Sequence, residues 1–123
     1  MQLIATIISF LVIDGVWIYF VANPLYKKHL PESFLANPVR IIYALAFYLL
    51  FSFALWFLFI RKATEFNTEL LLNVFIFGLT SYATYSLTNM AIIREWNLNV
   101  TIPDLLWGGV ISVLVTAVVL RFT

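Results

Sequence analysis

The chain has 123 residues, of which 63% are hydrophobic and 11% charged, and its mean hydropathy is +1.01. Soluble domains are roughly half apolar and a quarter charged, so these values predict a polytopic membrane protein with one integral domain over residues 1–123. The net charge of +1 argues against a nucleic-acid partner, and the lack of cysteine with a single histidine excludes thiolate and all-histidine metal sites within one chain.

The first predicted helix covers residues 3–22, an apolar run of about 20 residues that is long enough to cross a hydrocarbon core. A cleavable signal is the competing interpretation. It is disfavoured because no basic segment precedes the run, Asp14 lies in its middle, and no small-x-small cleavage site follows. We expect Asn23-Pro24 to end this helix and a water-exposed or interfacial loop to follow as far as Asn37.

The second predicted helix covers residues 39–60 and is rich in aromatic residues. Asn37 is a suitable N-cap, and Pro38 occupies the first helical position, where no amide hydrogen is needed. Arg61 and Lys62 follow the helix, where long cationic side chains reach the interface.

The third predicted helix covers residues 70–93, and a helical wheel divides it into two faces. We expect the apolar face to contact lipid; it contains Leu72, Ile76, Leu79, Ala83, Leu87 and Met90. We expect the polar face to point inward; it contains Asn73, Thr80, Ser81, Tyr82, Thr84, Tyr85, Thr88 and Asn89.

The fourth predicted helix covers residues 102–121. Thr101-Ile-Pro-Asp104 has the form of a capping box and would begin it. Four spans with short links predict an all-α fold, a four-transmembrane-helix up-down bundle.

The two halves of the chain share no motif, so an inverted-repeat transporter within one chain is not supported. The basic residues are divided too evenly between the two sides of the membrane to fix the orientation.

Asp14 is the candidate with the most weight, because an acid at this depth is costly and is usually functional. Its alternative is a structural acid that fixes helix register. At equal depth across the bundle we expect Phe47, Tyr48, Tyr82, Tyr85 and Ser112; a second level contains Tyr19, Tyr43, Asn89 and Trp107, with Asp104 just above.

The candidate residues for ligand binding or proton handling share this inward placement. They are Asp14, Tyr43, Tyr48, Tyr82, Tyr85, Thr88, Asn89, Asp104 and Trp107. Each also has a structural interpretation: interhelical hydrogen bonds for Thr88 and Asn89, packing for the tyrosines, a helix cap for Asp104 and an interfacial anchor for Trp107. No catalytic residue, cofactor or metal is assigned.

Several of these motifs occur together in one known family. Asp14 with Trp17, Phe47-Tyr48, Tyr82-Ala-Thr-Tyr-Ser-Leu-Thr-Asn89, Trp96 and Asp104-Leu-Leu-Trp-Gly108 resemble the DUF2177 family of predicted bacterial membrane proteins, over nearly the whole chain. The family pattern has an acid where this chain has Ser86. The resemblance implies a fold, a set of site positions and a bacterial inner membrane, and it implies no activity.

Three functions follow as hypotheses. The first is binding or transport of a small or amphipathic ligand, proton-coupled through Asp14, in a pocket that opens toward the first and third loops; transport would need a homodimer. The second is a membrane-embedded enzyme acting on a lipid or isoprenoid, with Asp14 or Asp104 as acid-base group. The third is an accessory or assembly protein whose polar residues are structural. The expected partners are membrane lipids, the ligand and a second copy of the chain.

Overall fold

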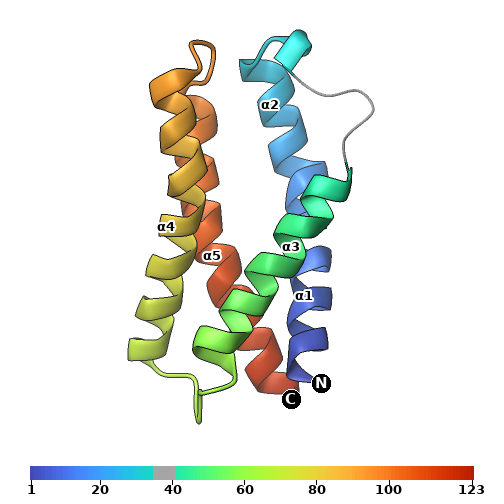
Figure 1. Ribbon diagram of the computed structural model, residues 1–123, viewed down its shortest axis with the longest axis vertical. Helices are drawn as coiled ribbons and strands as arrows, with labels where there is room; N and C mark the ends of the chain where they lie inside the picture. Colours follow the sequence, from blue (N-terminus) through green and yellow to red (C-terminus); the bar gives the residue numbers. More distant parts are fainter. Residues whose placement is uncertain (35–40) are drawn as a thin grey trace.

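The computed structural model describes residues 1–34 and 41–123, and four of its helices are long and apolar enough to cross a membrane. They are Gln2–His29, Ile41–Ile60, Thr68–Ile92 and Leu98–Phe122. Figure 1 shows them running alternately up and down, with both termini at the lower end. The predicted all-α class and four-span up-down bundle are therefore confirmed.

The first membrane helix is continuous through the proline that was expected to end it. It consists of α1 (Gln2–Trp17), a π-helical turn η1 (Ile18–Ala22) and α2 (Asn23–His29). In the π turn the Asn23 amide donates to the Ile18 carbonyl, five residues back. This wider turn directly precedes Pro24 and accommodates a ring that would otherwise clash with the preceding turn. The expectation that Asn23-Pro24 ends the helix is wrong, and residues 23–29 extend it beyond that point.

The second membrane helix consists of α3 (Ile41–Leu55) and a π-helical turn η3 (Trp56–Ile60), and a short 3-10 turn η2 (Glu32–Phe34) lies before it. The predicted cap at Asn37 and Pro38, and the start at residue 39, lie outside the described residues. The third helix, α4 (Thr68–Ile92), begins two residues earlier than predicted, because Asn67 caps it by accepting a hydrogen bond from the Leu70 amide at 2.9 Å.

The fourth membrane helix, α5 (Leu98–Phe122), begins one turn before the predicted capping box. Thr101 lies inside the helix and donates to the Asn97 carbonyl at 3.0 Å, so it is not the cap. The Asn97 side chain donates to the His29 carbonyl at 2.8 Å and thereby satisfies a backbone carbonyl at the end of α2. Asp104 is a buried side chain within α5, and the capping-box prediction is wrong.

The closest helix pair is α4 with α5, and glycine makes this approach possible. A Cβ atom built on Gly78 would overlap the Gly108 carbonyl oxygen and the Ser112 hydroxyl. A Cβ on Gly109 would meet the Phe75 ring at 2.6 Å. Small residues let membrane helices pack closely without any hydrophobic driving force between them, and Gly78, Gly108 and Gly109 do so here.

The helices α3 and α4 meet through large aromatic rings, in contrast to the close α4–α5 pair. Phe51 of α3 lies 5.4 Å from Phe77 of α4 between ring centroids, and Phe47 lies 5.9 Å from Tyr82. On its other side Phe51 packs on the fully buried Phe10 of α1 at 5.0 Å. Figure 1 shows α3 and α4 diverging toward the upper end, so the α1–α2–α3 group and the α4–α5 pair separate there.

The glycine contact makes a first prediction. Gly78→Ala should lower the free energy of unfolding by about 2 kcal/mol or more, because the added methyl group meets backbone that cannot move without separating α4 from α5. The measurement is thermal or denaturant unfolding of the purified protein in detergent. Gly15→Ala is the matched control, since nothing lies within 4 Å of its added Cβ. Equal stability of Gly78→Ala and Gly15→Ala would contradict this account of the packing.

Candidate functional site

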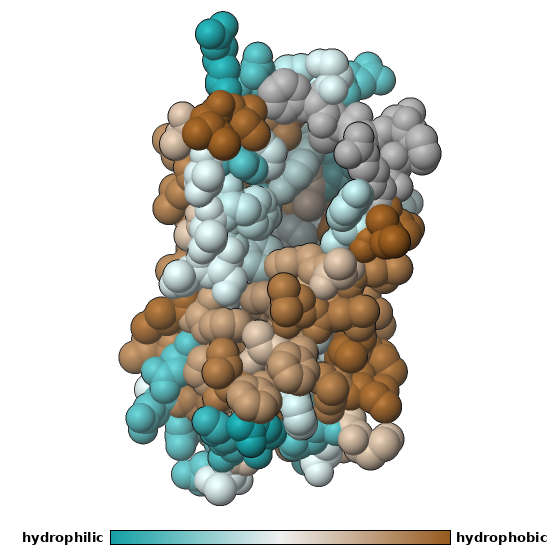
Figure 2. All heavy atoms as spheres, in the orientation of Figure 1, coloured by the Kyte–Doolittle hydropathy of each residue, from teal (hydrophilic) through white to brown (hydrophobic). Residues whose placement is uncertain are grey.

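A cleft of about 740 Å³ lies where the two helix groups separate. All four membrane helices contribute to its wall. Figure 2 shows the molecule hollowed in its upper half, beside the pale, weakly polar side chains over α4. A brown apolar band lies below the hollow, and the lower end is largely teal. The cleft therefore occupies the part of the bundle nearest the first and third loops.

The lining is mainly aromatic and contains the only two aspartates of the chain, Asp14 and Asp104. The aromatic lining residues are Trp17, Tyr26, Tyr43, Phe47, Tyr48, Tyr82, Tyr85 and Trp107. The remaining lining residues are Ile18, Ala22, Asn23 and Ala44. All of the chain's tyrosines except Tyr19 are among them.

Asp14 connects three helices. Its side chain is 5% exposed, and both carboxyl oxygens accept hydrogen bonds: Oδ2 from the Tyr48 hydroxyl of α3 at 2.6 Å and Oδ1 from the Trp107 indole of α5 at 2.8 Å. A buried polar group in a membrane must find such partners within the protein. The two donors therefore fix α1 in register with α3 and α5.

Asp104 forms a second centre, three residues before Trp107 on α5. Its Oδ2 accepts a hydrogen bond from the Tyr26 hydroxyl of α2 at 2.6 Å and a longer one from the Tyr85 hydroxyl of α4 at 3.4 Å. Three residues correspond to a rise of about 4.5 Å along an α-helix. The two carboxyl groups thus occupy successive levels of the same cleft.

Flat aromatic surfaces adjoin both centres. Trp17 and Trp107 stack with ring centroids 4.3 Å apart and planes 6° apart, beside Asp14. At the upper end Tyr26 meets Trp96 edge to face at 5.9 Å, and the Trp96 indole donates to Ser86 at 3.4 Å. Ser86 is fully buried and contributes to packing between α4 and the third loop.

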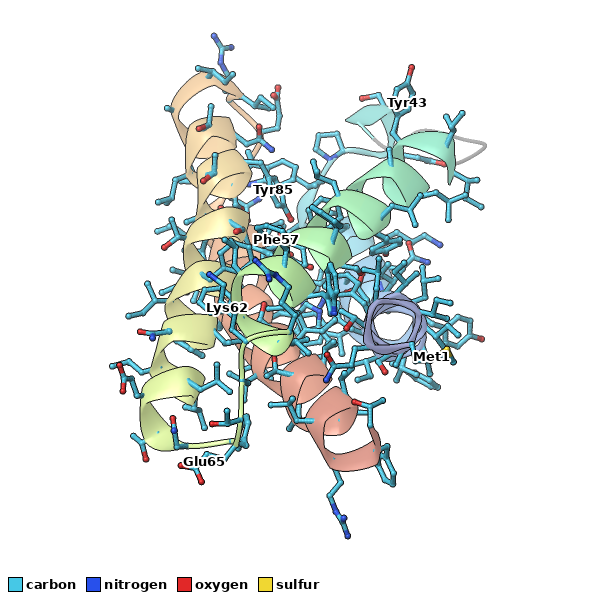
Figure 3. The ribbon with its side chains drawn as sticks, turned by 60° about the horizontal axis from the view of Figure 1, so that its bottom comes forward. Met1, Tyr43, Phe57, Lys62, Glu65 and Tyr85 are labelled. Atoms are coloured by element: carbon cyan, nitrogen blue, oxygen red, sulfur yellow. The ribbon has the colours of Figure 1, made fainter. Side chains whose placement is uncertain are left out.

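The structure brings most of the nine candidate residues together, and it separates two of them from the rest. The cleft is lined by Asp14, Tyr43, Tyr48, Tyr82, Tyr85, Asp104 and Trp107. Figure 3 shows Tyr85 reaching from α4 into the space on the α3 side, while Tyr43 stands at the far end of α3 and is 69% exposed. Thr88 and Asn89 are not lining residues, and Tyr19, which was expected at the second level, is 72% exposed.

The prediction that α4 is polar inward along most of its length is wrong. Its buried residues are Val74, Gly78, Tyr82 and Ser86, while Asn73, Thr80, Thr84 and Thr88 are exposed. Threonine can donate to the carbonyl four residues back in its own helix, and Thr84 and Thr88 do so at 2.8 and 2.5 Å. These hydroxyls therefore need no partner helix, and glycine decides which face of α4 meets α5.

Tyr26 is the site residue that sequence reasoning missed. It was assigned to a loop, because the first helix was expected to end at Asn23-Pro24. The signal was present in the spacing: Asp14, Ile18, Ala22 and Tyr26 recur every four residues, and all line the cleft. A continuous helix with a π turn keeps that spacing on one face.

Over the described part of the chain, no three histidine, cysteine, aspartate or glutamate side chains come together as a metal-binding group. The chemistry that these residues offer is hydrogen bonding through two carboxyl groups and several phenols, together with aromatic surface.

The fold and the cleft define an integral membrane protein of four spans with a mainly aromatic recess that contains two carboxyl groups. The family model described as predicted membrane protein, DUF2177, matches residues 1–120, and the chain belongs to that family. No curated protein and no solved structure matches the chain.

The three-helix contact of Asp14 makes a second prediction. In a double-mutant cycle, Asp14→Asn and Tyr48→Phe should show a coupling energy of about 0.6 to 1.7 kcal/mol, because Asp14→Asn weakens and Tyr48→Phe removes the same interhelical hydrogen bond. The measurement is the free energy of unfolding in detergent micelles. Tyr19→Phe is the control, since the Tyr19 side chain is exposed and has no hydrogen bond within the described residues. Additive effects of Asp14→Asn and Tyr48→Phe would show that the bond does not stabilise the fold.

Proposed function

We propose that this protein binds a small amphipathic ligand in the cleft between the α1–α2–α3 group and the α4–α5 pair. The observation that carries the proposal is the cleft itself, about 740 Å³ in volume, with two carboxyl groups on an otherwise mainly aromatic and apolar wall. Ligand sites of this size combine a mostly apolar lining with a few placed polar groups. A bacterial inner membrane is the proposed location, and membrane lipids are the proposed surroundings.

The direction of entry follows from the arrangement of the helices. The cleft lies near the loop ends of α2, α4 and α5, and its wall includes Asn23 and Tyr43 at that level. Exposed threonines of α4 continue the polarity on the face beside the recess (Figure 2). An amphipathic molecule at the membrane interface could place its polar head between the carboxyl groups and leave its apolar part between α3 and α4.

Transport is a narrower form of the same proposal. Four helices enclose little lumen, so movement of a ligand across the membrane would require a second copy of the chain to complete a path. The number of chains in the membrane-embedded particle would distinguish transport by a homodimer from binding by a single chain.

Protection from chemical labelling provides the test of binding. The chain has no cysteine, so Ala44→Cys on the cleft wall gives a single reactive thiol. With the protein held in amphipol, decyl maltoside below its micelle concentration should slow alkylation of this thiol by about five-fold or more, since an occupied cleft excludes the reagent. Ala91→Cys, exposed on α4 and away from the cleft, should label at an unchanged rate. No slowing at residue 44 by decyl maltoside or by a charged decyl amphiphile, or equal slowing at both positions, would overturn the proposal.

Proton coupling through Asp14 is a separate prediction. If ligand binding releases a proton from Asp14, decyltrimethylammonium should cause proton release from the wild-type protein in weakly buffered solution and none from Asp14→Asn. A pH-sensitive dye measures the release. Glu69→Gln, an exposed acid in the first turn of α4, is the control and should behave as wild type. Unchanged release from Asp14→Asn would rule out this role.

A further inference from the structure

Within the described residues, the carboxyl groups of the cleft have only neutral hydrogen-bond donors as partners. These donors are the side chains of tyrosine and tryptophan. None of the described residues that line the cleft is lysine, arginine or histidine. Carboxyl groups in a membrane interior are normally paired with an opposite charge or with a water-filled path. A cationic group on a ligand would supply a partner that the described cleft wall lacks.

The two carboxyl groups differ in what they can still accept. Each oxygen of Asp14 already accepts a hydrogen bond from another helix, so Asp14 offers a ligand no oxygen without a donor. At Asp104 both donors go to Oδ2, and Oδ1 receives none from the described part of the chain. Asp104 is one of the residues that line the cleft. Asp104 Oδ1 is the available acceptor for a ligand.

The aromatic residues of the cleft also attract cations. Tryptophan and tyrosine faces attract cations through the negative potential above the ring, and the attraction grows where water is excluded. The Trp17–Trp107 stack lies one helical turn from Asp104, and Tyr85 lies beside it. An anion would meet two carboxyl groups and these ring faces, so both features disfavour it.

We infer that the ligand of this cleft carries a positive charge, and that it is an amphipathic ammonium compound whose cationic head contacts Asp104 and whose hydrocarbon part lies against Phe47 and Ile18. This inference rests on the proposed function, since it names the class of ligand for the same cleft. The shared chemistry is an alkylated or protonated amine, either in a free compound or in the headgroup of an amine-containing lipid.

The test compares probes with one decyl chain and different heads on the full-length protein in amphipol. The probes are decyltrimethylammonium, decyl maltoside and decanoate, and affinity is measured by intrinsic tryptophan fluorescence and by protection of Ala44→Cys. The cation should bind about ten-fold or more tightly than the maltoside, and decanoate should bind most weakly, because the apolar part is constant and only the head differs. This comparison uses no substitution at Asp104, so it stands whether or not that variant folds.

Substitution then locates the contact. Asp104→Asn keeps the size of the side chain and should bring the affinity for decyltrimethylammonium to within about two-fold of that for decyl maltoside, leaving the maltoside unchanged. Glu69→Gln removes an acid outside the cleft and should change neither affinity. Retention of the cation preference in a folded Asp104→Asn protein would overturn the assignment of the contact.

The two proposals fail in different ways. If all three heads bind equally and all protect Ala44→Cys, the cleft binds amphiphiles and the inference on charge is wrong. If no probe protects Ala44→Cys, the proposed function itself is wrong.

A further comparison separates the two possible sources of the amine, a free compound and a lipid headgroup. Decylammonium is compared with lysophosphatidylethanolamine: tighter binding of the first supports a free amine, and equal or tighter binding of the second supports a lipid headgroup.

Discussion

The structure depends on satisfying two carboxyl groups at depths where lipid offers no hydrogen bonds. Asp14 achieves this by accepting from Tyr48 and Trp107, which belong to two other helices. Asp104 does so through Tyr26 and Tyr85, again from two other helices. Every membrane helix therefore takes part in at least one of these bonds, and the relative register of the helices follows from them.

The cleft results from unequal packing around this polar centre. Glycine brings α4 against α5 so closely that a single methyl group would not fit at Gly78, whereas phenylalanine rings keep α3 at a distance from α4. Because α4 lies close to α5 and aromatic rings separate α3 from α4, the four helices do not pack equally tightly at both ends of the bundle. The upper half opens as a cleft whose wall is mainly aromatic and includes the two carboxyl groups.

Much of the fold could be predicted from the sequence, because four long apolar runs and their short links allow few arrangements. The inward placement of Asp14, Tyr48 and Trp107 was also predictable, since acids and hydroxyls avoid lipid. The end of the first helix was predicted wrongly. A proline normally ends a helix, and this rule outweighed the four-residue spacing of Asp14, Ile18, Ala22 and Tyr26. That error moved Tyr26 into a loop and left Asp104 without its closest donor.

The inward face of α4 could not be predicted from the positions of its polar residues. A helical wheel treats every hydroxyl as a group that seeks a partner on another helix, but Thr84 and Thr88 donate to their own helix and remain exposed. Steric fit at Gly78 and Gly108 sets the orientation instead. Glycine carries no hydropathy signal of comparable strength, so the wheel gave Thr88 and Asn89 more weight than the structure supports.

The chain has only two aspartates and six tyrosines, so the contacts between their side chains can be measured directly. Solid-state NMR of protein labelled with ¹³C at the aspartate carboxyl carbons and the tyrosine ring carbons, in lipid bilayers, reports which of these groups are in contact. The structure predicts cross-peaks from Asp14 to Tyr48 and from Asp104 to Tyr26, and none from either aspartate to Tyr19. Aspartate carboxyl carbons that correlate only with lipid acyl chains would contradict the account.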